Sequence, residues 1–194
     1  PLKMATELLA GIPSVVYGFF GLVVLVPWIR NIAKSLQHAG IIRQSGNGNS
    51  ILTASLLLGM MILPTIIGVT ESAIRAVPPQ YYEGSLALGA THERSIFRTV
   101  LPAAKSGILA GVVLGIGRAI GETMAVIMVA GNQPRLTGSI FKGVRTLTAN
   151  IVIEMGYAAD LHREALIATG VVLFVFILII NAAVAILKRR ADHE

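Results

Sequence analysis

The sequence predicts an all-α membrane protein organised as a single transmembrane domain over residues 1–194. Of its residues, 54% are hydrophobic and only 13% are charged, and the mean hydropathy is +0.74. Soluble domains usually carry about 25% charged residues. Several apolar stretches also approach the roughly 20 residues that a helix needs to cross the hydrocarbon core of a bilayer. Lipid, and not water, is therefore the solvent of most of this surface.

Four such stretches can be delimited along the chain. The predicted spans cover residues 8–29, 51–69, 103–130 and 165–187. Prolines interrupt the first two, and we expect a kink at Pro64, which membrane helices tolerate where neighbouring groups satisfy the freed carbonyl. The fourth span ends at the basic run Lys188, Arg189 and Arg190, which favours a cytoplasmic C-terminus.

Tracing back from that end places the segment 131–164 outside the cell and the segment 71–102 inside. Within the outer segment, apolar residues recur at helical spacing, namely Ile140, Val144, Leu147, Ile151 and Met155. They predict an amphipathic helix. We expect this helix to pack on the spans, with a position on the membrane surface as the alternative. The same tracing places the segment 30–50 outside as well. Basic residues occur in both outer segments, so the positive-inside rule alone does not decide the orientation.

The inner segment 71–102 is too polar to span a membrane, and its sequence predicts a helix–turn–helix unit. Pro78 and Pro79 mark a break, after which a helix can begin. Gly89 suits a left-handed cap for that helix, and Thr91 suits the N-cap of a second one, which we expect Pro102 to end. Such a unit, joined to a span on each side, can transmit force from a soluble partner into the membrane.

Two charged residues, Arg118 and Glu122, lie deep in the third predicted span. They fall about 22 Å along the helix from Ala103 at a rise of roughly 1.5 Å per residue. Charges at such depth cost at least about 2.5 kcal/mol each on insertion scales and therefore usually have a role. At a spacing of four in one helix they would share a face and could pair.

The same face of the predicted helix carries glycines, including Gly111 and Gly115. Small residues let another helix or a solute approach the backbone closely. Arginine presents a planar fork of donors that suits a tetrahedral oxyanion, and it stays charged. We therefore assign Arg118, Glu122, Gly111 and Gly115 to a path for an anion. The alternative is an ion pair that only locks two helices together.

Composition and motifs exclude several classes of function. The chain has 0 Cys, which excludes disulfides and cysteine metal sites, and we expect no metal site. Its net charge of +6 comes from scattered residues, which speaks against nucleic-acid binding. No G-x-x-x-x-G-K-[ST] loop is present, so we expect no ATPase site and no enzymatic activity of its own. Because the sequence begins at Pro1 without a signal peptide, we expect it to be a piece of a longer protein.

The inner segment resembles the cytoplasmic signature of ABC importer permeases. That signature reads Glu-Ala-Ala, three residues, Gly, nine residues, Ile, one residue, Leu-Pro, and its counterparts here are Glu83-Gly84-Ser85, Gly89, Thr99 and Leu101-Pro102. The resemblance implies that Glu83, Gly89, Leu101 and Pro102 shape a coupling element that docks in a cleft of an ATPase subunit.

Two further stretches, Gly11–Gly18 and Gly117–Ala125, resemble phosphate-specific transport permeases, and the second is closer to the PstC-type subunit. The resemblance implies a type I ABC importer permease fold, of which this chain holds the last four of six spans. It associates Arg118 and Glu122 with phosphate passage. It also implies a bacterial or archaeal cytoplasmic membrane, a PstA-type permease partner, two ATPase subunits that bind ATP with Mg, and an extracytoplasmic phosphate-binding protein.

Three other functions remain open at this point. Permeases for sulfate, molybdate or phosphonate would share the coupling signature, and Arg118 alone does not separate these anions. An ion-coupled carrier could use Glu122 as a proton site, but it leaves the signature at Glu83–Pro102 unexplained. A membrane scaffold or sensor would give the charged pair a structural role only.

Overall fold

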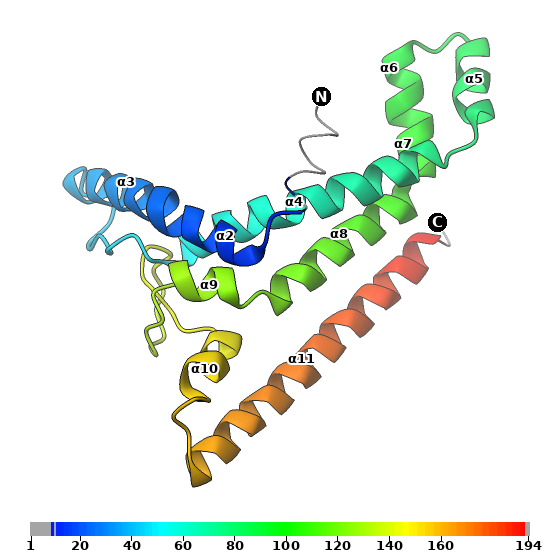
Figure 1. The fold of residues 1–194 in the computed structure, drawn as a ribbon. Coiled ribbons are helices and arrows are strands. Elements are labelled where there is room, and N and C mark those ends of the chain that lie inside the picture. Colours follow the sequence, from blue (N-terminus) through cyan, green and yellow to red (C-terminus); the bar gives the residue numbers. More distant parts are fainter. Residues whose placement is uncertain (1–8, 10, 193–194) are drawn as a thin grey trace. The chain divides into compact units, whose positions relative to one another are not determined.

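A computed structural model describes residue 9 and residues 11–192 (Figure 1). In this part of the chain, regular structure is helical, apart from an isolated bridge between Gly131 and Val144, which confirms the all-α prediction. The chain divides into two compact units, unit 1 with Pro1–Ala10, Ile62–Arg118 and Ile179–Glu194, and unit 2 with Gly11–Met61 and Ala119–Leu178. Residue 8, where the first predicted span begins, lies outside the described residues.

Three described helical runs are long and apolar enough to cross a membrane. They are Ser14–His38, Ile51–Arg75 and Asp160–Ala183. A fourth candidate consists of two shorter helical stretches, His92–Ala103 and Lys105–Gly121, which meet at an angle of 67°. The predicted number of four spans is reached when this bent pair is included.

The first run belongs to unit 2 and consists of α2 (Ser14–Phe20), the π-helical segment η1 (Gly21–Leu25) and α3 (Val26–His38). The π-helical segment directly precedes α3, whose second residue, Pro27, has no N–H to give to the helix. The run extends beyond the predicted end at residue 29. Ile29 and Ala33 are 2% and 1% exposed and pack with Phe141, so tertiary contacts extend the helix into polar sequence.

The core of unit 2 lies where α2 and η1 meet α9 (Met124–Val129) and the N-terminal half of α4 (Ile51–Arg75). Leu57, Ala125 and Val129 are fully buried there. Gly18 and Gly21 make this approach possible. A β-carbon at Gly21 would lie 2.8 Å from Val129 Cγ1, so a larger residue would push the helices apart.

The loops of unit 2 are fixed to the start of α4 by backbone hydrogen bonds. Ile51 N donates to Lys142 O (3.2 Å), and Leu52 N donates to Ile140 O (2.9 Å). These bonds explain why the predicted amphipathic helix is shorter than expected. Ile140 and Val144 lie in the loop, and only α10 (Leu147–Glu154) is helical.

Helix α10 packs against α9 within unit 2, as we expected of the amphipathic segment. Its Ala149 is fully buried, and α10 contacts α9. Ile151 Cδ1 lies 3.9 Å from the position that a β-carbon would take at Gly170 of α11 (Asp160–Asp192). Helix α11 is longer than the predicted span 165–187 at both ends. Asp160 in its first turn favours the earlier start through the helix dipole.

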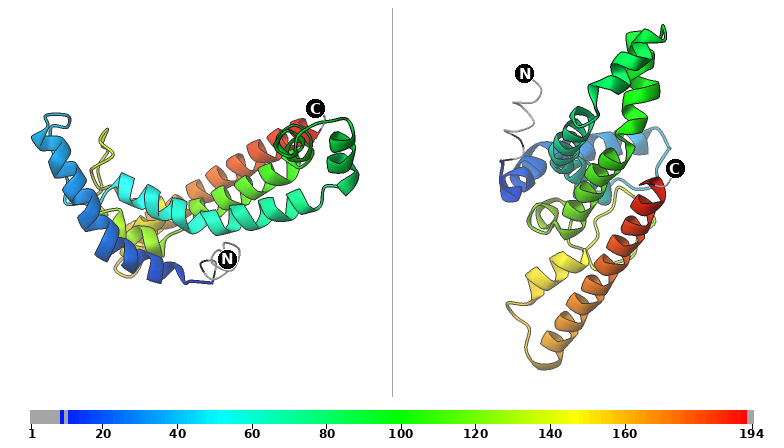
Figure 2. Two further views of the ribbon diagram at one scale, coloured as in Figure 1. Left: turned by 90° about the horizontal axis from the view of Figure 1, so that it is seen from above. Right: turned by 90° about the vertical axis from the view of Figure 1, so that its right-hand side faces the viewer.

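In unit 1, α8 (Lys105–Gly121) runs beside the C-terminal half of α4 (Figure 1 and Figure 2). Every fourth residue of α8 in this contact is a glycine, and their counterparts on α4 follow in antiparallel order. Gly107 faces Ala73, Gly111 faces Val69 and Thr70, and Gly115 faces Ile66 and Ile62. Pro64 lies inside α4, which continues through it to Arg75.

The third predicted span, 103–130, is wrong as a single helix. Helix α8 ends at Gly121, residues 122 and 123 are not helical, and α9 starts at Met124. Two glycines near the end of α8, Gly117 and Gly121, each weaken a helix by about 1 kcal/mol relative to alanine. The helix therefore has little local support at this point.

The contact between α8 and α4 predicts opposite effects for two matched substitutions. In Gly107→Ala the new methyl group meets the β-carbon of Ala73, which has no rotamer to move to, so we expect a loss of about 1–3 kcal/mol of stability. In Gly117→Ala the methyl group enters open space, and we expect no loss or a gain of up to about 1 kcal/mol. Thermal unfolding of the purified full-length permease in detergent measures both. Equal shifts in melting temperature would contradict the packing role of the glycines.

Candidate functional site

The polar insert of unit 1 forms a helical hairpin over residues 79–103, and its turn follows the predicted pattern. Helix α5 (Pro79–Ala87) begins with Pro79 at its first position. Gly89 has φ +84° and so takes the left-handed conformation that follows a helix end. Helix α6 (His92–Ser95) has Thr91 as its N-cap, whose hydroxyl accepts a 3.3 Å hydrogen bond from Arg94 N.

Polar contacts hold the two arms of the 79–103 hairpin together. Tyr82 Oη and His92 Nδ1 are 2.6 Å apart, and the rings meet edge to face. Thr99 Oγ1 lies 3.4 Å from Ser85 Oγ, with which it forms a hydrogen bond. Ser85 and Thr99 are two of the positions where the sequence departs from the permease signature. The two residues that differ from the signature therefore contact each other, because their hydroxyl groups form one hydrogen bond.

The second arm ends at Ala103, one residue beyond the predicted end at Pro102. After α6 the chain continues through the π-helical segment η2 (Ile96–Val100) and α7 (Leu101–Ala103). Leu101 N donates to Ile96 O in the wide spacing of a π-turn, directly before Pro102. Pro102 occupies an N-terminal position of α7, where its missing N–H costs little. The chain then bends by 67° and enters α8, so the hairpin is joined to α8 almost without a loop.

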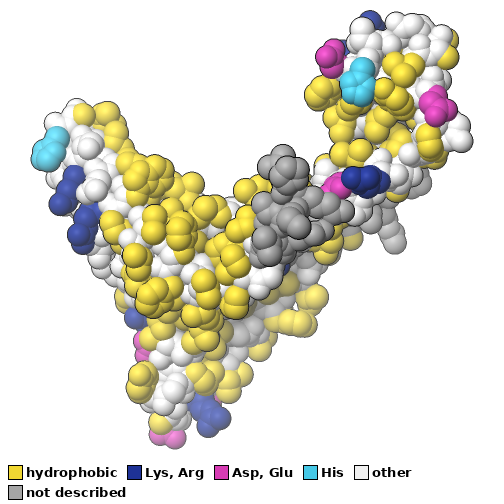
Figure 3. Space-filling view, turned by 45° about the horizontal axis from the view of Figure 1, so that its top comes forward, with side chains coloured by type: hydrophobic (Ala, Val, Ile, Leu, Met, Phe, Trp, Pro, Cys, Tyr) yellow, Lys and Arg dark blue, Asp and Glu magenta, His cyan; other side chains and the backbone are white. Residues whose placement is uncertain are grey.

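Apolar side chains are exposed on the hairpin. Leu88 is 91% exposed and Phe97 is 67% exposed, with Tyr81 and Leu86 also exposed. Figure 3 shows hydrophobic side chains on this part of the chain among acidic, basic and histidine side chains. Large exposed apolar groups beside charges are typical of a surface that binds another protein.

The structure distributes the four residues of the predicted coupling element over the two arms. Glu83 lies exposed on α5, and Gly89 lies in the turn that follows. Leu101 and Pro102 lie at the far end of the second arm, next to α8. Glu83 lies in the middle of α5, and the hydrogen bond between Ser85 and Thr99 places this part of α5 beside the second arm. Of the four, only Gly89 lies at the free end of the hairpin.

Arg118 lies in the last turn of α8, where a positive charge is favoured by the helix dipole. Its Nη1 atom donates a 3.4 Å hydrogen bond to Thr65 Oγ1 on α4. The side chain is otherwise exposed on unit 1. Among the described residues, Arg118 makes no other side-chain hydrogen bond and no ion pair.

Glu122 follows the end of α8 and caps α9 in unit 2. Its Oε1 accepts hydrogen bonds from Thr123 N (3.0 Å) and Ala125 N (3.1 Å). A carboxylate at this place satisfies free N–H groups and suits the positive end of a helix. The expectation that Arg118 and Glu122 share one helix face is wrong, because the helix ends between them, at Gly121.

Gly111 and Gly115 are both buried in the contact between α8 and α4. They face a neighbouring helix of the same chain, which is one of the two uses of a glycine stripe that the sequence leaves open. They set the distance between α8 and α4. A role of these glycines in a path for an anion stays a prediction.

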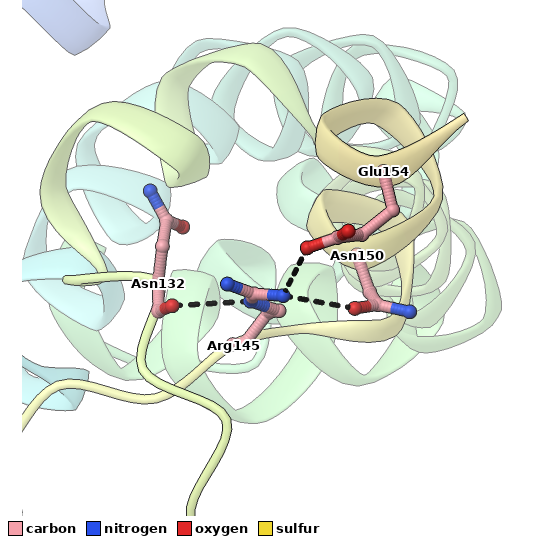
Figure 4. Close-up of polar contacts among 4 residues, drawn as sticks. All are labelled: Asn132, Arg145, Asn150 and Glu154. Carbon is pink, nitrogen blue, oxygen red and sulfur yellow. Dashed lines mark hydrogen bonds and ion pairs between the residues drawn. The ribbon is translucent and has the colours of Figure 1, made fainter. Parts of the chain in front are cut away.

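Sequence reasoning missed a second polar cluster, in unit 2, around Arg145 (Figure 4). Arg145 Nη1 lies 2.7 Å from Glu154 Oε1 and 3.3 Å from Asn150 Oδ1, both on α10. Its Nε donates to Asn132 O (3.1 Å). Asn132 is in the left-handed conformation, and its Nδ2 donates to Ile127 O near the end of α9 (2.7 Å). The cluster thus ties α10 to α9. The pair Gly131-Asn132, which tolerates positive φ, was the available signal.

Known proteins resemble this chain over almost its whole length. The family described as "Binding-protein-dependent transport system inner membrane component" matches residues 1–193. The phosphate transport system permease protein PstC of Mesorhizobium japonicum is 38% identical over 202 residues, which cover 99% of this chain and 62% of that protein. The PstC protein of Haemophilus influenzae is 35% identical over 202 residues, with 97% and 62% covered.

A probable ABC transporter permease protein of Bacillus subtilis, YqgH, is 42% identical over 186 residues, which cover 93% of this chain and 57% of that protein. The chain thus spans about three fifths of the length of these relatives. No solved structure matches it at a significant level. The matches confirm the resemblance to phosphate-transport permeases.

The Arg145 cluster predicts that replacing Arg145 destabilises the protein more than replacing Arg75. Arg145 and Glu154 keep only 21% and 29% of their side-chain surface exposed, whereas Arg75, paired with Glu71 at 2.9 Å, is 73% exposed. We expect Arg145→Ala to lower the free energy of unfolding by about 1–3 kcal/mol, because it leaves half-buried acceptors without a donor. Arg75→Ala should cost less than about 1 kcal/mol. Hydrogen exchange of the α10 amides, which should quicken only in Arg145→Ala, provides the second readout. Unchanged exchange there would contradict the tie between α10 and α9.

Proposed function

This chain belongs to the family of binding-protein-dependent transport system inner membrane components, and from that membership we propose that it forms part of the membrane path of an ATP-driven phosphate importer. The named phosphate permeases among its relatives support phosphate as the substrate. Permeases for sulfate, molybdate or phosphonate are the alternatives within the same class. An ion-coupled carrier would need no hairpin of the kind seen at residues 79–103.

The observation that carries this proposal is the hairpin itself. It presents exposed apolar side chains at its free end and continues into α8 through one bend. A protein bound to Leu88 and its neighbours can therefore move α8 directly. Because the chain holds no phosphate loop for ATP, we assign that protein as an ATPase subunit, which binds ATP with Mg. The coupling element is then shaped by Glu83 on α5, Gly89 at the turn, and Leu101 and Pro102 where the hairpin joins α8.

Arg118 supplies the site for the anion in this proposal. It lies on the helix that the hairpin moves, it is permanently charged, and it presents a planar set of donors to an oxyanion. Its partner in the structure, Thr65, is neutral. Glu122 lies just beyond the end of α8 and holds the start of α9 through its carboxylate. Movement of α8 relative to α9 would then pass through the non-helical residues 122 and 123.

The complete transporter in this proposal contains four further proteins. They are a homologous permease of the PstA type, two ATPase subunits and an extracytoplasmic phosphate-binding protein. The complex lies in a bacterial or archaeal cytoplasmic membrane, crossed several times by this chain, with its C-terminus in the cytoplasm. Transport follows alternating access, in which ATP closes the ATPase subunits and moves the coupling hairpins.

Uptake of radiolabelled phosphate tests the role of Arg118. Proteoliposomes would contain the full-length permease, its permease partner, the ATPase subunits and the binding protein. We expect Arg118→Gln to lower ATP-dependent uptake at least tenfold, since removing one partner of a charge-assisted contact costs about 1.5–3 kcal/mol. Arg163→Gln, which removes an exposed charge on α11, is the matched control and should keep normal uptake.

Competition with unlabelled sulfate, molybdate and phosphonate in the same assay identifies the anion. Inhibition by phosphate alone supports the proposed substrate. Stronger inhibition by one of the other anions would replace it, and uptake that follows a proton gradient without ATP would refute the transporter class.

Copurification tests the docking role of the hairpin. Leu88→Asp places a charge in the proposed interface and should abolish copurification of the ATPase subunits with the full-length permease. Leu136→Asp is the matched control, because Leu136 is also fully exposed but lies in the loop between α9 and α10. Retention of the ATPase by Leu88→Asp would show that the hairpin docks elsewhere or not at all.

A further inference from the structure

We propose that Thr65 on α4 is the positioning residue for Arg118. This inference rests on the proposed function, because it concerns the arginine that we assign to the anion. Thr65 Oγ1 accepts the hydrogen bond from Arg118 Nη1 at 3.4 Å, across 53 residues of sequence. In the described part of the chain, no other side chain holds the guanidinium group.

The packing of unit 1 explains why Thr65 can reach Arg118. Gly115, one turn before Arg118, brings the α8 backbone against Ile62 and Ile66 of α4. A β-carbon at Gly115 would lie 2.6 Å from Ile66 Cγ1, so the approach is as close as a glycine allows. Thr65 lies between these two isoleucines in sequence and places a hydroxyl at the edge of the contact.

The chemistry of the partner determines what Arg118 can still do. A carboxylate in the place of Thr65 would neutralise the guanidinium charge and occupy two of its donors. A hydroxyl occupies one donor and leaves the charge uncompensated. Arg118 therefore keeps four of its five N–H donors for an oxyanion, while its position on α8 is held by a neutral contact. Thr65 thus fixes the arginine without competing with the substrate.

A second threonine on the same helix supplies a matched control. Thr70 also lies in the contact with α8, where its Oγ1 is 3.3 Å from the position of a β-carbon at Gly111. Its hydroxyl is buried and has no hydrogen-bond partner among the described residues. Replacement of Thr70 by valine keeps the shape of the side chain and removes no hydrogen bond, so it tests packing alone.

The test compares Thr65→Val, Thr65→Ser and Thr70→Val in the full-length permease, assembled with its partners in proteoliposomes. We expect Thr65→Val to lower the maximal rate of phosphate uptake about threefold to tenfold, the effect of losing one hydrogen bond of ordinary strength, because the contact is long at 3.4 Å. Thr65→Ser, which keeps the hydroxyl, should restore most of the rate. Thr70→Val should transport like the wild type. Assembly of the complex and its melting temperature should be the same in all variants.

Several outcomes would overturn the inference. Normal uptake by Thr65→Val would show that Arg118 does not depend on the hydroxyl, and failure of Thr65→Ser to restore the rate would assign the effect to packing. An equal loss of uptake in Thr70→Val would also assign the effect to packing. If the Thr65→Val permease does not assemble with its partners, Thr65→Ala is used in its place. The same loss of uptake is expected, and normal uptake would again overturn the inference. Absence of phosphate uptake by the wild-type complex would instead refute the proposed function, so the two failures are distinguishable.

Discussion

The close approach of α8 to α4 is the constraint on which the rest of unit 1 depends. In lipid, two apolar helices gain little from burying hydrophobic surface against each other, and close packing has to hold them together. The glycines at positions 107, 111 and 115 provide that packing along about two turns of α8. The contact fixes both ends of α8 relative to α4. One end receives the 79–103 hairpin, and the other carries Arg118 to Thr65. In the proposed function, a movement imposed on the hairpin would reach the arginine through this packed helix pair.

Irregular backbone lies at both ends of α8, where the proposed movement would have to be absorbed. The π-helical segment η2 precedes Pro102, and the bend of 67° follows it. At the other end of α8, residues 122 and 123 interrupt the helix before α9. Prolines and glycines explain both places, since they remove donors or helix stability locally. Helix α8 is therefore a regular helix between two local breaks. This arrangement would let α8 move as one rigid element in the proposed function.

Local rules predicted the parts of this structure that local interactions determine. Pro79, Gly89 and Thr91 each act through their own backbone or the next turn, and the hairpin has the expected cap at each of them. Tertiary contacts decided the rest. Helix α3 continues to His38 because Ile29 and Ala33 pack on Phe141, and the segment around Ile140 is not helical because its backbone bonds to α4. Apolar periodicity could not reveal that the third span breaks at Glu122, because the break leaves the apolar pattern intact on both sides.

The two arginines of interest show why burial or spacing alone does not identify a functional charge. Arg145 contacts a carboxylate, an amide oxygen and a backbone carbonyl, so its charge is compensated and its donors are used within unit 2. Arg118 has one neutral partner within unit 1. An arginine whose charge is already neutralised stabilises a fold. An arginine that is held in place but not neutralised retains an electrostatic field and free donors, and both are needed to bind an oxyanion in a medium of low dielectric constant. The neutral partner of Arg118, more than its depth in the span, is therefore the reason to assign it to the path of the anion.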